Sequence, residues 1–141
     1  MQPLRKPTTA SGGFSLVELT VVVVILGVLA MVGVPKYRTV VERAKSAEAF
    51  TYLAHIEGAQ ERYNATKGKY AKRMGQLDVK VPRPEHFRVG RFSSVDWQTQ
   101  WELKLTRSQK SSGFGHYRVT WNQDGFQPAR SSIHQDLIPV N

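Results

Sequence analysis

The chain has 141 residues, a formal net charge of +9 and no cysteine. Its length leaves room for one small domain, and the lack of cysteine excludes disulfides and thiolate chemistry. The positive charge favours anionic partners such as nucleic acid, lipid headgroups or polysaccharide, although an inert basic surface has the same composition.

Residues 1–13 are short, polar and basic, and they contain two prolines. They are typical of the n-region of an export signal, which is removed from the mature protein. An ordinary secretory signal would be cut after Ala30. The acid Glu18 and the length of the apolar run that follows it weigh against that alternative.

Residues 14–35 form the most distinctive stretch, with no charge between Leu19 and Val34. As a helix this stretch would span roughly 33 Å at about 1.5 Å per residue, enough to cross a bilayer core. Glu18 is its one acid. A carboxylate in such a run is costly and therefore needs a partner.

The segment Gly13-Phe14-Ser15-Leu16-Val17-Glu18-Leu19, the apolar run after it and Pro35 resemble the N-terminal signature of type IV prepilins and type II secretion pseudopilins. The resemblance implies cleavage between Gly13 and Phe14 by a membrane prepilin peptidase, which would also N-methylate Phe14. It places the N-terminus in the cytoplasm before cleavage. The mature chain would then move from the inner membrane, through an assembly platform, into a periplasmic or cell-surface filament.

The same resemblance gives two further residues a role in assembly. Glu18 would pair with the α-ammonium of Phe14 on a neighbouring subunit, so the acid gains the partner that its burial requires. Pro35 removes a backbone hydrogen bond, so a kink or local melting is expected there. It marks either a bend at the membrane exit or a segment that unwinds as subunits pack.

Helical spacing of apolar residues predicts a helix over residues 36–67 that stops at Gly68. Charged residues, including Glu42 and Glu57, would occupy its other faces. The apolar stripe expected to face a core consists of Tyr37, Val40, Val41, Ala44, Ala47, Ala49, Leu53, Ile56, Ala59 and Tyr63.

Residues 68–91 are predicted to form a loop rich in lysine and arginine, with aromatic residues interleaved. Lys69, Lys72 and Arg73 are its candidate anion-binding residues, since cations hold phosphates and aromatic rings stack on bases. No binding motif accompanies them, and a solvated loop explains the same composition.

Residues 92–141 are predicted to form antiparallel strands. Alternation of apolar and polar residues from Val95 to Leu105 indicates a half-buried strand, and a second one follows a turn at residues 111–113. Asp124-Gly125 predicts a tight hairpin turn, and Pro128 confines the last strand to an edge or ends it early.

The predicted fold class is therefore α+β. By the resemblance it is the pilin fold: a long N-terminal helix, transmembrane in its first half, packed against a small C-terminal antiparallel sheet. Residues 36–141 would form the periplasmic or extracellular domain.

No catalytic or metal-binding constellation stands out, because the four histidines are scattered along the chain. Residues 122–125 resemble the start of a calcium loop, but with so few acids nearby a turn is expected. We therefore expect no enzyme activity and no metal or cofactor.

The function indicated is that of a structural subunit of a type IV pilus or secretion pseudopilus. Its partners would be copies of itself, other pilins or pseudopilins, the peptidase and the membrane. Two alternatives stay open: a DNA-binding minor pilin for uptake, and a signal-anchored periplasmic binding domain that does not polymerise.

Overall fold

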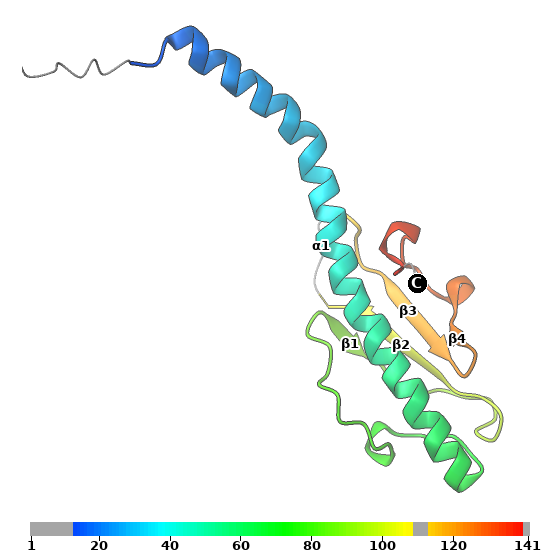
Figure 1. The fold of residues 1–141 in the computed structure, drawn as a ribbon. Helices are drawn as coiled ribbons and strands as arrows, with labels where there is room; N and C mark the ends of the chain where they lie inside the picture. The colour runs from blue at the N-terminus through cyan, green and yellow to red at the C-terminus, as the bar shows by residue number, and fades with distance from the viewer. Residues whose placement is uncertain (1–12, 109–112, 140–141) are drawn as a thin grey trace, which may run out of the picture. The chain divides into compact units, whose positions relative to one another are not determined.

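The computed structural model describes residues 13–108 and 113–139. It shows one long helix, α1 (Leu16–Lys67), and a small antiparallel sheet. The predicted α+β class is therefore confirmed (Figure 1). Of the predicted leader, residues 1–13, only Gly13 is among the described residues.

The helix α1 extends over both compact units of the chain, Met1–Pro35 and Lys36–Asn141. Pro35 lies inside the helix, so α1 is not melted there in the single chain. A proline removes one backbone hydrogen bond, and the unwinding expected as subunits pack stays a prediction. The end of α1 is confirmed. Gly68 has a φ of +66°, and its N–H donates to the carbonyl of Asn64 at 2.7 Å.

The sheet has the order β1-β2-β3-β4, with each neighbouring pair antiparallel. Its strands are β1 (Phe87–Val89), β2 (Glu102–Arg107), β3 (Arg118–Asn122) and β4 (Gly125–Phe126). Within the described ranges, the short 3₁₀ helices are η1 (Met74–Gln76), η2 (Pro128–Arg130) and η3 (Gln135–Leu137). The prediction of a loop throughout 68–91 is wrong at β1, because a strand of 3 residues is too short to show a period.

The strand predicted from Val95 begins only at Glu102. Val95 is 95% exposed, and the segment between these two residues forms a turn. The carboxylate of Asp96 accepts hydrogen bonds from the Gln98 N–H at 3.0 Å and from the Thr99 hydroxyl at 2.9 Å. This local side-chain bonding replaces strand pairing. Within β2 the predicted alternation is confirmed from Leu103 to Leu105, but Glu102, predicted on the polar face, is buried.

The hairpin predicted at Asp124-Gly125 is confirmed, since Asn122 pairs with Gly125 and the φ of Gly125 is +90°. The strand β4 lies at the edge of the sheet and ends at Phe126, before Pro128. Both outcomes fit a proline that cannot donate to a ladder. Of the turn predicted at residues 111–113, the first two residues lie outside the described ranges.

The hydrophobic core lies between the second half of α1 and one face of the sheet (Figure 1). Burial of apolar surface on both elements is the main force that holds them together. The core side chains are Ala49, Tyr52, Leu53, Ile56, Tyr70, Phe87, Trp101, Leu103, Leu105, Tyr117, Val119 and Leu137.

The buried face of α1 only partly follows the predicted stripe. Four of the predicted residues are buried: Ala49, Leu53, Ile56 and Ala59. Tyr37 and Val40, at the start of the stripe, are 70% and 66% exposed. Glu42, Ser46 and Gln60 are buried instead. Polar side chains therefore take part in the contact with the sheet, which hydropathy spacing cannot detect.

Gly90, which follows β1, is expected to tolerate no side chain. Its N–H donates to the carbonyl oxygen of Lys104 at 2.9 Å, and a Cβ would lie 2.7 Å from that oxygen. The variant Gly90→Ala should lower the free energy of unfolding by about 1–3 kcal/mol. Urea unfolding of the full chain in detergent, followed by tryptophan fluorescence, measures the loss.

The matched control is Gly75→Ala, because nothing lies within 4 Å of a Cβ built there. Equal losses in the two variants would contradict the close-approach explanation.

Candidate functional site

The residues predicted to be processed lie in an open, non-helical stretch before α1. Nothing lies within 4 Å of a Cβ built at Gly13, and Phe14 is 77% exposed. Regular helical bonding starts when the Leu19 N–H donates to the Ser15 carbonyl at 3.1 Å. The peptide bond between Gly13 and Phe14 is therefore accessible.

Glu18 lies in the first turn of α1 and is exposed. An acid at this position is favoured by the unpaired N–H groups of a helix N-terminus. Within the part of the chain that the structure describes, the Glu18 side chain has no hydrogen-bond or ion-pair partner. Its carboxylate is therefore available to a group from outside the chain.

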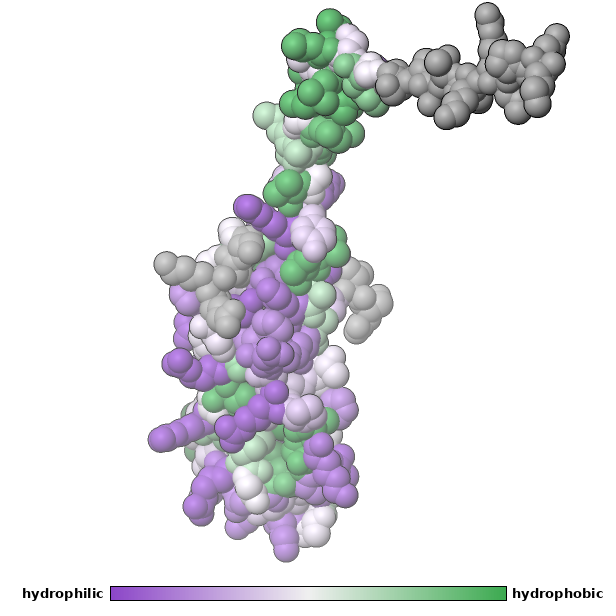
Figure 2. Space-filling model, turned by 90° about the vertical axis from the view of Figure 1, so that its left-hand side faces the viewer, coloured by the Kyte–Doolittle hydropathy of each residue, from purple (hydrophilic) through white to green (hydrophobic). Residues whose placement is uncertain are grey.

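Residues 14–38 are all exposed, and from Leu19 to Val34 none of them is charged. Figure 2 shows the hydrophobic side chains that gather on one face of this segment. Thr20 carries the one hydroxyl between Leu19 and Val34, and it is satisfied internally because it donates to the Val17 carbonyl at 2.8 Å. By length and composition this helix is able to cross a membrane. An apolar surface of this extent has to be covered by lipid or by protein.

A buried ion pair joins α1 to β2. The Nε of Arg107 donates to Oε1 of Glu42 at 2.7 Å, and the two side chains are 1% and 2% exposed. Arg107 also donates from Nη1 to the carbonyl of His86 at 2.9 Å. The expectation that Glu42 faces solvent is wrong, because its partner lies 65 residues away in sequence.

Tyr117 completes this site, which we call the Glu42 cluster (Glu42, Arg107 and Tyr117). Its hydroxyl donates to Glu42 Oε1 at 2.9 Å. Burial raises the pKa of Glu42, but the hydrogen bonds from Arg107 and Tyr117 and the charge of Arg107 lower it more, so it lies below 4.5. Burial and the bond to Glu42 raise the pKa of Tyr117 well above its ordinary range. The cluster therefore holds a carboxylate, a guanidinium and a neutral phenol.

Two further acids on α1 bind elements of the sheet. The Glu48 carboxylate accepts from the backbone N–H groups of Glu85 and His86 at 2.6 and 3.2 Å. Burial raises the pKa of Glu48, and these bonds together lower it below its usual value. Glu57, also expected to face solvent, accepts from the Trp121 indole at 2.6 Å. The acids of the helix therefore fix its position on the sheet.

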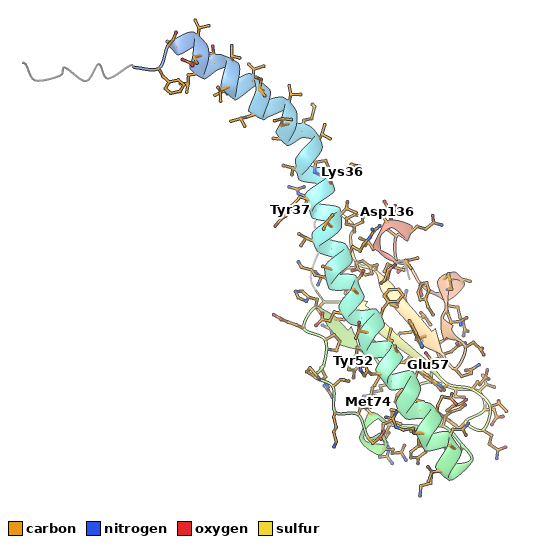
Figure 3. All side chains as sticks on the ribbon, in the orientation of Figure 1. Lys36, Tyr37, Tyr52, Glu57, Met74 and Asp136 are labelled. Carbon is orange, nitrogen blue, oxygen red and sulfur yellow. The ribbon has the colours of Figure 1, made fainter. Side chains whose placement is uncertain are left out.

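The C-terminal segment binds the same helix near its entry into the domain. Arg43 Nε donates to the Asp136 carbonyl at 2.6 Å, and Figure 3 shows Asp136 beside the helix. The Ser46 hydroxyl donates to the carbonyl of Leu137, a buried residue. This part of α1 is thus bound both by β2 and by the C-terminal segment.

The predicted basic residues Lys69, Lys72 and Arg73 are all exposed. Lys72 and Arg73 line a surface groove of about 390 Å³, which we call the basic groove. Arg91, which the sequence did not single out, lines it too, whereas Lys69 does not. In the sequence, Arg91 is one of several cations in a basic stretch, and nothing there sets it apart from the others.

The stretch that resembled a calcium loop is a hairpin turn. The Asn122 side-chain oxygen accepts from the Asp124 N–H at 2.8 Å, which uses the oxygen within the turn. In the described ranges, no three residues among His, Cys, Asp and Glu come together as a metal site.

No family model matches this chain, but several characterised proteins are similar to it. Type II secretion system core protein G of Vibrio cholerae is 34% identical over 97 residues, which is 65% of this chain and 64% of that protein. Fimbrial protein EcpC of Eikenella corrodens is 39% identical over 56 residues, 40% of this chain and 37% of the relative. A fimbrial protein of Pseudomonas aeruginosa is 29% identical over 118 residues, 82% of this chain and 64% of the relative.

These matches cover between 40% and 82% of this chain. The chain spans between 37% and 64% of the length of these three relatives.

Breaking the Glu42 cluster from one side should be costly. Glu42→Leu leaves a buried guanidinium without its counter-charge, so the free energy of unfolding should fall by about 3–5 kcal/mol, and Arg107→Met should act similarly. The double variant should lose less than the sum of the two, because it leaves no unpaired charge. Urea unfolding of the full chain in detergent gives the three values.

Two controls accompany this comparison of the single and double variants. Arg62→Met breaks a solvent-exposed pair with Asp78 and should change stability little. The pKa of Glu42 is lower in the folded chain than its ordinary value of 4.5. Its contribution to the free energy of unfolding is therefore fully present above pH 4.5 and is lost as the pH falls through the folded-state pKa. The free energy of unfolding of the double variant should therefore fall less than that of the wild type when the pH is lowered. Additive single losses would contradict a coupled pair.

Proposed function

We propose that this chain, which belongs to the family of type IV pilins and type II secretion pseudopilins, is a structural subunit that polymerises through its N-terminal helix. The observation that carries the proposal is the fully exposed apolar surface of residues 14–34, with Glu18 as its one acid. Lipid covers this surface in a monomer, and neighbouring helices cover it in a filament.

Glu18 supplies the register for this packing. Its carboxylate has no partner within the described chain, and a carboxylate surrounded by apolar helices requires one. Cleavage between Gly13 and Phe14 would create an α-ammonium on Phe14, four positions before Glu18 in the sequence. The ammonium of one subunit and the Glu18 carboxylate of the next would then form a buried pair that selects a single axial register.

Processing and location follow from the same proposal. A membrane prepilin peptidase would remove residues 1–13 and N-methylate Phe14, with the N-terminus cytoplasmic before the cut. The exposed Gly13–Phe14 peptide supports this step, because a peptidase needs an extended, accessible backbone. One long apolar N-terminal helix fits an inner-membrane-anchored subunit, with Pro35 at the membrane exit and residues 36–141 as the periplasmic or extracellular domain.

The relatives include proteins named for pili and for type II secretion. A pilus subunit and a pseudopilus subunit therefore both fit this chain, and an inner-membrane assembly platform would act on either. These relatives are structural proteins, which supports a structural role here as well.

A signal-anchored periplasmic domain that does not polymerise is the rival, and a conventional signal cut after Ala30 is a further alternative. The N-terminal residue separates them: methylated Phe14 for a pilin, Met1 for an uncut anchor and Met31 for a conventional cut.

Cleavage is expected to depend on Gly13. A glycine leaves the backbone open to the peptidase, so Gly13→Leu should leave the precursor in the membrane. Mass spectrometry of the purified protein gives the N-terminal residue, with Gly12→Leu as the neighbouring control. A Gly13→Leu protein that still starts at residue 14 would show that cleavage does not depend on the glycine.

Glu18 is expected to matter for assembly and not for insertion. Glu18→Ala removes a charge that is costly in lipid, so membrane insertion and cleavage should persist. Filament yield should fall sharply, because the neighbour's ammonium is then buried without its counter-charge. Glu18→Gln should share much of this defect, since the amide keeps the shape but not the charge.

The measurement is the ratio of sheared filament to membrane-bound subunit after cleavage has been confirmed by mass. Glu85→Ala, an exposed acid in the domain, is the control. Normal yield from Glu18→Ala would rule out the carboxylate as an assembly contact.

A further inference from the structure

The basic groove is built from two segments of the domain that are distant in sequence. Lys72, Arg73 and Met74 line one side, and Gly90, Arg91 and Phe92 line the other. The close contact of Gly90 with the Lys104 backbone sets the position of the second side. The groove is therefore formed by the fold and does not depend on one flexible loop.

The charge of the groove is uncompensated. None of its six lining residues is an acid. In residues 13–108 and 113–139, neither Lys72 nor Arg73 nor Arg91 forms an ion pair. The first acid that follows each side in sequence is engaged elsewhere: Asp78 pairs with Arg62 at 2.9 Å, and Asp96 bonds within its own turn. A groove with three cations that form no ion pair attracts a ligand that carries repeated negative charge.

Aromatic rings accompany these cations. Phe92 is half-buried and is held edge-on to Trp101, with ring centroids 5.7 Å apart. The Lys72 ammonium lies 5.8 Å from the centroid of the Trp97 ring. Trp97 is fixed in this place because its carbonyl accepts from the Tyr70 N–H at 2.8 Å. Rings beside free cations are the combination that binds bases and phosphates together.

We propose that the basic groove binds single-stranded nucleic acid. Lys72, Arg73 and Arg91 contact successive phosphates, with the planar arginine groups suited to bidentate contact. Unstacked bases pack on Phe92 and Trp97, which a duplex would not allow because its bases remain stacked inside. This proposal does not rest on polymerisation, since every residue involved lies in the unit Lys36–Asn141.

The test is fluorescence anisotropy with the full chain in detergent and a labelled oligothymidine of about 20 nucleotides, at salt from about 50 to about 200 mM. The triple variant Lys72→Gln, Arg73→Gln, Arg91→Gln should bind at least about tenfold more weakly. Its log–log salt slope should be smaller by about 2, the value for three lost phosphate contacts on a single strand.

The matched control carries the same charge change at exposed cations away from the groove lining: Lys36→Gln, Arg38→Gln, Arg118→Gln. It should keep affinity within about threefold, because only diffuse attraction is lost. Equal losses in the two triple variants, or no binding by the wild type at low salt, would overturn the proposal.

A separate variant tests whether bases stack on Phe92. Phe92→Leu keeps an apolar side chain against Trp101 and should weaken binding to oligothymidine several-fold, while binding to dextran sulfate stays unchanged. Thermal melting of each variant shows that the domain remains folded. If dextran sulfate binds as tightly as oligothymidine and Phe92→Leu changes neither, the groove is a general polyanion surface and the nucleic-acid proposal is wrong.

Discussion

A carboxylate and a guanidinium that have both been removed from water fix how α1 lies on the sheet. Transfer of the Glu42 and Arg107 charges into the interior is costly, and only close geometry and additional hydrogen bonds offset that cost. Tyr117 and the His86 carbonyl supply those bonds. A shift of the helix by one residue would separate the pair, so the pair specifies a single register in a contact that apolar packing alone leaves less well defined.

The other helix–sheet bonds follow from that register. With Glu42 in place, Glu48 reaches the backbone at the start of β1 and Glu57 reaches the Trp121 indole. Met74 of η1 lies beside Tyr52 of α1, whose hydroxyl is 4.0 Å from the sulfur (Figure 3). Each acid sits on the helix and each partner on a later segment. The polar contacts therefore repeat the same design along the helix.

Much of the fold could be predicted because it depends on local signals: the apolar run before Pro35, the glycine after Lys67 and the Asp124-Gly125 turn. Failures occurred where a distant partner or a side-chain turn overrode the local pattern. Glu42 looked like a solvent residue because Arg107 lies 65 positions away. Around Val95 apolar and polar residues alternate as in a strand, but the Asp96 carboxylate accepts bonds from its own turn, and the segment does not pair as a strand. Lys72 and Arg73 were found from charge alone, whereas Arg91 joined them only through the packing of Gly90.

The row of helix contacts from Glu42 to Glu57 also has a mechanical consequence. A force directed along α1 would load the Arg107, His86 and Trp121 bonds in parallel and in shear, since they are spaced along the helix. Bonds loaded in this way share the tension, whereas bonds at one end would break one after another. A domain with bonds arranged in this way resists separation from its own helix under tension. That property suits a subunit that is joined to its filament through the same helix.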